Sequence, residues 1–279
     1  MTEPAAQLDA TTRDADARDQ ALLDAVIHRL ESAEATVLDP AHEARVMRTL
    51  AATWRGPVAP SVGLRVYREV LGAALRRHKP VSLHVADKDR DVAELARAHF
   101  GFAMPMTVYP TSSMVVQALV DDRNAIGLVP APLSDDGQAG WWSNLSPATG
   151  TGPRIVAKLP FFQGDGSAVR HPVSYALASV PVAASGGDTT LIAVFLRGEM
   201  SRSRLGQVLK ATTLDAQVIA MGHDQPERAA RRFLVEAAGF VQVNDSRLNA
   251  LRAHGGDEIA DVAIVGAYAN PVIFGGAKS

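Results

Sequence analysis

Charged and imidazole side chains lie near the ends of three expected helices and are the first residues whose types could do chemistry. Arg29 lies at the edge of an amphipathic helix, and the next helix opens with Asp39, His42 and Glu43. His78 ends a third helix, within a basic run that could attract a dicarboxylate. Guanidinium and imidazolium groups pair with carboxylates, so residue types alone connect this basic run with an anionic ligand.

The same residues also fit ordinary structural roles. Arg29 could be a solvated charge on a helix edge. Asp39, with His42 and Glu43 behind it, fits an N-cap followed by the acidic first turn of a helix. His78 at a helix C-terminus interacts favourably with the helix dipole. The sequence leaves both interpretations open.

Composition excludes several classes of protein. The 279-residue chain has a net charge of −2 and no cysteine, which excludes disulfides and cysteine-ligated metal sites. This weak charge favours neither nucleic-acid nor membrane binding, and no stretch approaches the roughly 18 apolar residues of a membrane span. The first twenty residues are acidic and Ala-rich, unlike a signal peptide, so we expect a cytoplasmic protein.

The first eighty residues predict three helices. After a disordered leader at 1–7, an uninterrupted helix should cover about 8–37, with apolar positions 22, 23, 26, 27 and 30 on one face. Asp39-Pro40 starts the second helix, at about 41–54, because Asp caps well and Pro suits the first turn. Ser61 can cap the third helix, which ends near Pro80.

From Pro80 the pattern changes to alternating strands and helices, which is typical of a parallel or mixed sheet flanked by helices. The expected strands cover 81–86, 105–109, 125–131, 154–159 and 174–180, and the expected helices cover 91–100 and 112–121. Trp141 and Trp142 are expected to anchor the packing of this lobe.

A second pattern follows a Gly-rich linker at 185–188. Strand 189–196, helix 201–211, strands 214–221 and 230–238, helix 245–253 and strand 259–266 make the βαββαβ order of a ferredoxin-like domain. We therefore expect an α+β multi-domain protein. Its parts are the leader, a three-helix domain at 8–79, a central α/β lobe at 80–184, a ferredoxin-like domain at 185–273 and a tail at 274–279.

The helical motifs resemble a known enzyme family. Asp19 to Arg29 is similar to a D-x-x-L-L-x-L-L-x-x-R helix, Pro40 to Glu43 to a P-x-R-E helix start, and Tyr67 to Val70 to an F-R-E-I segment. Together they resemble the all-helical chorismate mutases.

The later units extend this resemblance. Residues 125–137 and the closing Val265-Gly266-Ala267-Tyr268 resemble the dehydratase and regulatory parts of the bifunctional chorismate mutase–prephenate dehydratases. His99-Phe100-Gly101 and Trp141-Trp142 resemble landmarks of a proteobacterial chorismate mutase group with a dehydratase-like remnant.

The resemblance implies conversion of chorismate to prephenate in aromatic amino-acid biosynthesis. That rearrangement needs no metal or cofactor, because a site accelerates it by holding the dianion and by placing positive charge near the breaking ether bond. The implied catalytic residues are Arg29, Asp39, Glu43 and His78, and the implied substrate-binding residues are Arg13 and His42.

The chain departs from the family pattern at important positions. The family lysine between the positions of Arg29 and Asp39 has no counterpart, since the first lysine is Lys79. Losing one preorganised donor costs about 10²–10³ in rate. The dehydratase loop G-P-x-G-[ST] is replaced at 86–90, so we expect no dehydratase activity. The alternative is a catalytically silent homologue that binds a ligand or a partner protein as a regulatory subunit.

Assembly follows from the length of the first helix. A helix over 8–37 would be about 45 Å long at 1.5 Å per residue, longer than its two neighbours can cover. In the resembling family this helix is shared between two subunits, so we expect a homodimer.

Overall fold

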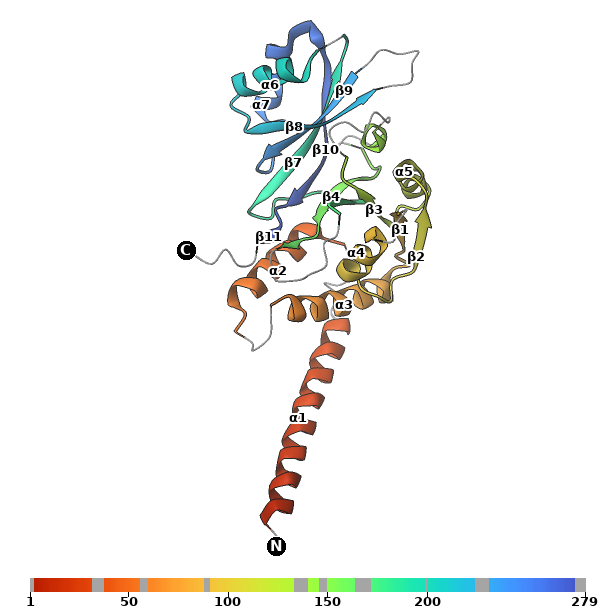
Figure 1. Ribbon diagram of the computed structural model, residues 1–279, viewed down its shortest axis with the longest axis vertical. Helices are drawn as coiled ribbons and strands as arrows, with labels where there is room; N and C mark the ends of the chain where they lie inside the picture. Colours follow the sequence, from red (N-terminus) through yellow and green to blue (C-terminus); the bar gives the residue numbers. More distant parts are fainter. Residues whose placement is uncertain are drawn as a thin grey trace.

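The computed structural model describes residues 3–31, 38–55, 60–87, 91–132, 140–145, 150–163, 172–198, 200–223 and 231–273. It begins with three helices, α1 (Glu3–Glu31), α2 (Pro40–Thr53) and α3 (Pro60–His78). Helix α1 projects away from the rest of the molecule, with the N-terminus at its far tip, and it contacts α3 (Figure 1). None of the described helices is long and apolar enough to cross a membrane.

The start of α1 differs from the sequence expectation. Residues 1–7 were expected to be a disordered leader, whereas the helix already begins at Glu3. Pro4 then falls in the first turn, where a missing backbone N–H breaks no helical hydrogen bond. The expected continuation of this helix at 32–37 lies outside the described residues.

After these helices, the described residues contain a mixed sheet of nine strands, in the order β2-β1-β3-β6-β4-β10-β7-β9-β8. Its strands are β1 (Leu83–Ala86), β2 (Met106–Tyr109), β3 (Ile126–Pro130), β4 (Arg154–Leu159), β6 (Ser174–Ala178), β7 (Asp188–Leu196), β8 (Ala216–His223), β9 (Arg231–Ala238) and β10 (Ile259–Ala269). A separate pair joins β5 (Phe162–Gln163) to β11 (Val272–Ile273).

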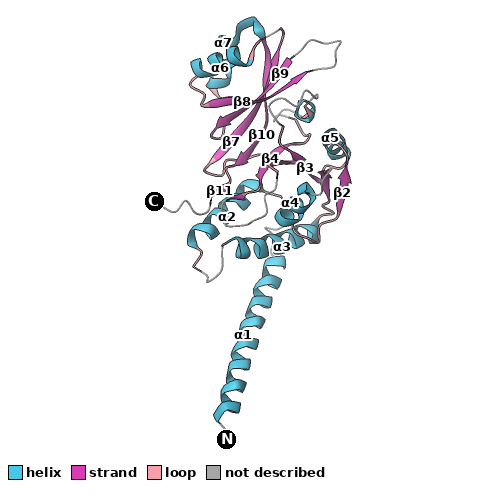
Figure 2. Cartoon of the chain, in the orientation of Figure 1, coloured by secondary structure: helices cyan, strands magenta, loops and turns pink. Residues whose placement is uncertain are grey.

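Helices cover the two ends of this sheet (Figure 2). Helices α4 (Asp91–Phe100) and α5 (Ser112–Asp121) flank the strands β1 to β3, which are parallel to one another. Helices α6 (Arg202–Ala211) and α7 (Ser246–Gly255) pack on β7 to β10. The order β7-α6-β8-β9-α7-β10 is the expected βαββαβ pattern. The sheet continues across residue 185, so strand pairing alone does not separate a central lobe from a C-terminal domain.

Three apolar cores hold these layers together. One lies where α2, α3 and α4 meet the sheet and includes Met47, Leu83 and Phe100. The second lies on the opposite face and includes Trp141 and Trp142. Both tryptophans are buried, as expected for packing anchors, in a short 3-10 helix (Trp141–Asn144). The third core lies under α6 and α7.

Helix α3 approaches α4 very closely. A Cβ atom at Gly72 would lie 2.2 Å from the carbonyl oxygen of Phe100, so only glycine allows this packing. Glu69, one turn earlier, accepts hydrogen bonds from the backbone N–H groups of Phe102 (2.7 Å) and Ala103 (3.4 Å). The helical part is therefore packed intimately against the α/β part.

Candidate functional site

The start of α2 brings three of the expected site residues into one helical turn. The Asp39 side chain accepts a hydrogen bond from the backbone N–H of His42 at 2.9 Å, which makes Asp39 the N-cap. Asp39 and His42 are both exposed. The capping role expected for Asp39 is confirmed, and its catalytic role stays a prediction.

Glu43 turns inward from the same helix. Its Oε2 lies 2.5 Å from Nη1 of Arg68 on α3, and the two side chains are only 12% and 7% exposed. Both residues belong to the motifs noted in the sequence, but their pairing was not expected. The Glu43 carboxylate is therefore already paired with an arginine of the same chain.

His99 of α4 completes this cluster. It is buried and packs edge-on against Phe100, with the ring centres 4.7 Å apart. Burial, together with the neighbouring charge of Arg68, holds the pKa of His99 well below its ordinary value of 6.5. His99 is therefore neutral near pH 7, while Glu43 and Arg68 form an ion pair beside it.

A small cavity lies beside the ion pair. Its volume is about 20 Å³. The lining residues come from α2, α3, α4 and four strands, and all are apolar except Glu43, Arg68 and His99. A cavity of this size holds a water-sized group and is far too small for a ring-bearing dicarboxylate such as chorismate.

The remaining expected residues lie elsewhere. Arg13 is exposed and Arg29 is half-buried, both on α1. Sixteen residues separate them, or about 24 Å along the helix axis at 1.5 Å per residue. His78 is the last residue of α3, and its side chain lies outside the described residues. Within one chain, the structure thus unites Asp39, His42 and Glu43 in one turn of α2, and it places Arg13 and Arg29 on a different helix, α1.

Two further arginines of α2 bind the segment that leads into β7, and one of them also binds the residue after β10. The Arg48 guanidinium donates to the carbonyl oxygens of Ser185 (3.0 Å), Gly187 (2.6 Å) and Asn270 (3.2 Å), and to the Ser185 hydroxyl (2.9 Å). Arg45 donates to the Ala184 carbonyl oxygen at 3.0 Å. Sequence patterns give no signal for these contacts, because the acceptors are mostly backbone groups that lie between 137 and 222 residues away.

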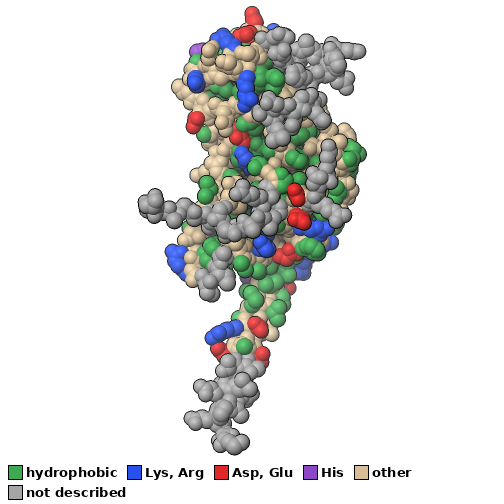
Figure 3. All heavy atoms as spheres, in the orientation of Figure 1, with side chains coloured by type: hydrophobic (Ala, Val, Ile, Leu, Met, Phe, Trp, Pro, Cys, Tyr) green, Lys and Arg blue, Asp and Glu red, His purple; other side chains and the backbone are tan. Residues whose placement is uncertain are grey.

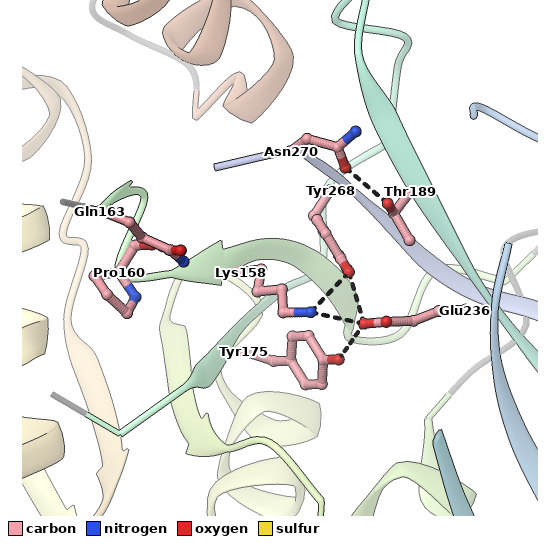
Figure 4. Close-up of polar contacts among 8 residues, drawn as sticks. All are labelled: Lys158, Pro160, Gln163, Tyr175, Thr189, Glu236, Tyr268 and Asn270. Atoms are coloured by element: carbon pink, nitrogen blue, oxygen red, sulfur yellow. Dashed lines mark hydrogen bonds and ion pairs between the residues drawn. The ribbon is translucent and has the colours of Figure 1, made fainter. Parts of the chain in front are cut away.

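A second polar cluster lies between the two halves of the sheet (Figure 4). One oxygen of Glu236, on β9, accepts three hydrogen bonds. The donors are Lys158 Nζ of β4 (2.9 Å), the Tyr175 hydroxyl of β6 (2.8 Å) and the Tyr268 hydroxyl of β10 (2.6 Å). Lys158 also donates to the Tyr268 hydroxyl at 3.2 Å. The cluster therefore ties four strands to a single carboxylate.

These hydrogen bonds shift the acidity of the cluster. Burial alone would raise the pKa of Glu236, but the bonds from Tyr268, Lys158 and Tyr175 outweigh it and lower that pKa below 4.5. Burial, followed by the charge of Glu236, raises the pKa of both tyrosines. The carboxylate stays ionised and the phenols stay protonated, which is the arrangement of a stable structural network.

A third polar group lies beside α5. His84 Nδ1 is 2.9 Å from the Tyr109 hydroxyl, and Ser82 Oγ is 3.5 Å from His84 Nε2. Ser82 also donates to Asp122 at 3.4 Å. This chain of half-buried groups satisfies its own members. No group of three His, Cys, Asp or Glu side chains that could hold a metal ion occurs in the described parts of the chain.

No protein-family model and no curated protein sequence matches this chain. Among solved structures, it is similar to one described as "GqqA- a novel type of quorum quenching acylases", with 15% identity and a TM-score of 0.47 over 70% of this chain and 96% of that chain. It is also similar to the prephenate dehydratase of Streptococcus mutans, with 10% identity and a TM-score of 0.46 over 68% of this chain and 98% of that chain. The prephenate dehydratase of Staphylococcus aureus subsp. aureus Mu50 is also similar, with 10% identity and a TM-score of 0.46 over 67% of this chain and 99% of that chain.

These similarities concern the fold. The chain has a mixed α/β fold that is similar to prephenate dehydratase folds at low sequence identity. The chorismate mutase part of the expected resemblance has no counterpart among them and stays a prediction.

Proposed function

We propose that this chain is a chorismate mutase-type protein of aromatic amino-acid biosynthesis, which converts chorismate to prephenate as a homodimer. The observation that carries the proposal is the exposed apolar face of α1. This helix holds both candidate carboxylate-binding arginines, and it exposes Leu22, Leu23 and Ile27 to between 51% and 59%. The motifs of all three helices support the same family.

Two copies of α1 could bring together the two arginines that lie about 24 Å apart along one copy. In an antiparallel pair that crosses near residue 21, Arg13 of one copy would lie at the same level along the pair as Arg29 of the other, because 13 and 29 are equally far from 21. Two such arginines would hold the two carboxylates of the substrate. Figure 3 shows apolar side chains, in green, on the projecting part of the chain. The pairing would bury the exposed apolar side chains of α1.

The proposed site works by electrostatics and positioning. The arginines would hold the dianion in its reactive shape. Asp39 and Glu43 would accept hydrogen bonds from the substrate, and His78 would supply a donor near the ether oxygen in place of the family lysine. To bind the substrate, the Glu43 carboxylate would first have to break its ion pair with Arg68. Dehydratase activity is proposed to be absent.

A second candidate is the silent homologue that binds a ligand or a partner protein. The contacts of Glu43 and Glu69 favour it, because each is already engaged with another part of the same chain. In this case the helical part would act as a structural adapter on the α/β part.

A complementation assay distinguishes the two. Chorismate loss is followed on the full chain, with prephenate identified. Arg13→Ala and Arg29→Ala should each lower turnover by about 10²-fold or more, since each removes a preorganised donor. Arg18→Ala is the matched control on α1, because Arg18 pairs with Asp14 on the surface (2.6 Å).

Mixing the two inactive variants gives the sharper result. A mixed dimer contains one site with both arginines intact, so an equal mixture should regain about a quarter of the parent activity. If the parent chain never exceeds the uncatalysed rate, the silent homologue is correct and the mutase proposal fails.

A further inference from the structure

One guanidinium of α2 binds the C-terminal part of the chain, residues 185–273, through four hydrogen bonds. Arg48 Nη1 donates to the carbonyl oxygen and the hydroxyl of Ser185, and Nη2 donates to the carbonyl oxygens of Gly187 and Asn270. Each terminal nitrogen of an arginine carries two N–H donors, so these bonds can use all four. Hydrogen bonds from a charged donor are about twice as strong as neutral ones, which makes Arg48 a strong attachment point.

The loop that accepts these bonds is itself held in place. The buried Asp188 carboxylate, at the start of β7, accepts hydrogen bonds from the backbone N–H groups of Ser185 (2.9 Å) and Gly186 (3.2 Å) and from the Ser185 hydroxyl. Gly186 has a φ of +97°, in the left-handed region that favours glycine. Asn270 directly follows β10. Arg48 therefore binds backbone that is continuous with two central strands of the sheet.

The first turn of the same helix carries three residues of the proposed site. Asp39 caps α2, and it accepts hydrogen bonds from the backbone N–H groups of His42 (2.9 Å) and Glu43 (3.0 Å). Arg48 lies nine residues after Asp39, or about 14 Å along the helix axis at 1.5 Å per residue. Because helices are stiff elements, a displacement at one end of such a segment is carried to the other end.

We infer that Arg48 is a positioning residue of the proposed site, through which the C-terminal part of the chain holds Asp39, His42 and Glu43 in place. The catalytic consequence rests on the proposed function. The structural consequence, a first turn held by contacts with residues 185–187 and Asn270, can be measured without substrate.

Catalysis should depend on this attachment more than substrate binding does. A displacement of about 1 Å in a catalytic group can cost about 10² in rate. The arginines proposed to bind the substrate carboxylates, Arg13 and Arg29, lie on α1. Loosening α2 should therefore lower kcat while KM changes little.

Hydrogen–deuterium exchange on the full chain tests the structural consequence. Arg48→Met keeps an unbranched apolar side chain and removes all four hydrogen bonds. The ratio of amide exchange at His42 and Glu43 to amide exchange in α6 should rise by about tenfold, since one bond to a charged group accounts for about that factor in an opening equilibrium. A general loss of stability would accelerate α6 at least as much and would not raise this ratio.

Arg55→Met is the matched control. Arg55 follows α2, and its guanidinium donates to the nearby carbonyl oxygens of Ala52 and Trp54. This variant loses the same charge but keeps the four bonds of Arg48, so its exchange ratio should equal that of the parent. Arg48→Lys should restore part of the parent ratio, because one ammonium can serve some of the acceptors. Equal ratios in the parent, Arg48→Met and Arg55→Met would overturn the inference.

Kinetics on the same variants separate this inference from the proposed function. For chorismate, Arg48→Met should lower kcat by about tenfold or more with little change in KM, and Arg55→Met should keep both parent values. A raised KM with unchanged kcat would overturn the positioning role, as would a lower kcat without a change in the exchange ratio. If the parent itself never exceeds the uncatalysed rate, the proposed function fails, and the exchange ratio alone decides whether the C-terminal part holds the first turn of α2.

Discussion

Gly266 of β10 lies against Ile155 of β4 so closely that a Cβ atom at position 266 would stand 2.2 Å from the Ile155 carbonyl oxygen. These two residues form the parallel bridge between β10 and β4. On the other side β10 pairs with β7 along its whole length. The contact at Gly266 therefore joins the two halves of the nine-stranded sheet.

Gly266→Ala should destabilise the protein. The added methyl group meets backbone that cannot swing aside, and overpacking of this kind costs about 1–3 kcal/mol in free energy of unfolding. Gly206→Ala in α6 is the matched control, because a Cβ there meets nothing within 4 Å. That change should be neutral or stabilising by up to about 1 kcal/mol, since alanine favours helix. Chemical denaturation of both variants checks the difference, and equal stabilities would contradict the role of Gly266.

How far the sequence predicts this fold depends on the range of the interactions. The bounds expected at 91–100, 112–121 and 154–159 coincide with α4, α5 and β4, because hydrophobic periodicity and capping are local. No local sequence pattern predicts that β10 pairs with β4. Gly266 is one of 22 glycines, and its close approach depends on a strand more than a hundred residues earlier.

In the candidate site, too, local contacts can be predicted from the sequence and long-range contacts cannot. The capping role of Asp39 is visible in Asp39-Pro40, because the cap acts within one turn. The partner of Glu43 is not visible, since Arg68 lies 25 positions later on another helix. Motif matching identifies both residues as family positions, but only packing shows that they bind each other.

Glu236→Gln should be strongly destabilising. The change weakens three hydrogen bonds and leaves Lys158, with a side chain only 24% exposed, without its counter-charge. Breaking one partner of a buried pair costs about 3–5 kcal/mol, and the partial exposure of Lys158 should reduce this to about 2–3 kcal/mol. Glu258→Gln is the control, because the Arg204–Glu258 pair is about half exposed and should cost less than about 0.5 kcal/mol.

The same residue should govern stability in acid. The pKa of Glu236 is lower in the folded protein than its ordinary value of 4.5, so the unfolded chain binds a proton first as the pH falls. Its stabilising contribution is present above pH 4.5 and is lost as the pH drops through the folded value. Unfolding free energies measured between pH 3 and 6 should therefore fall more steeply for the parent than for Glu236→Gln. Parallel curves would rule out this role.

His99 should make stability depend on pH in a higher range. Its pKa is held well below 6.5 by burial and by Arg68, so the unfolded state gains a proton that the folded state rejects. Stability is therefore complete above pH 6.5 and declines below it, by at most about 1.4 kcal/mol per pH unit. His99→Gln should remove most of this decline between pH 6.5 and 5.

His84 provides the comparison for that measurement. Burial also lowers the pKa of His84, but nearby Asp122 acts in the opposite direction, and the residue is only half-buried. His84→Gln should therefore remove less of the pH dependence than His99→Gln. A larger effect at His84 would contradict the assignment to the cluster of Glu43, Arg68 and His99.

The final prediction concerns the exposed face of α1. Leu22, Leu23 and Ile27 are each more than half exposed, and fully burying such a side chain is worth about 1.5–3 kcal/mol. If a second copy covers this face, Ile27→Asp should convert the parent from a dimer to a monomer of 29.5 kDa in light scattering at micromolar concentration. Val120→Asp is the matched control, because Val120 is 52% exposed on α5 and lies outside the proposed interface. The control should leave the mass unchanged, and both variants should keep the circular dichroism spectrum of the parent. A parent chain that is already monomeric at this concentration would refute the homodimer and, with it, a site shared between two copies of α1.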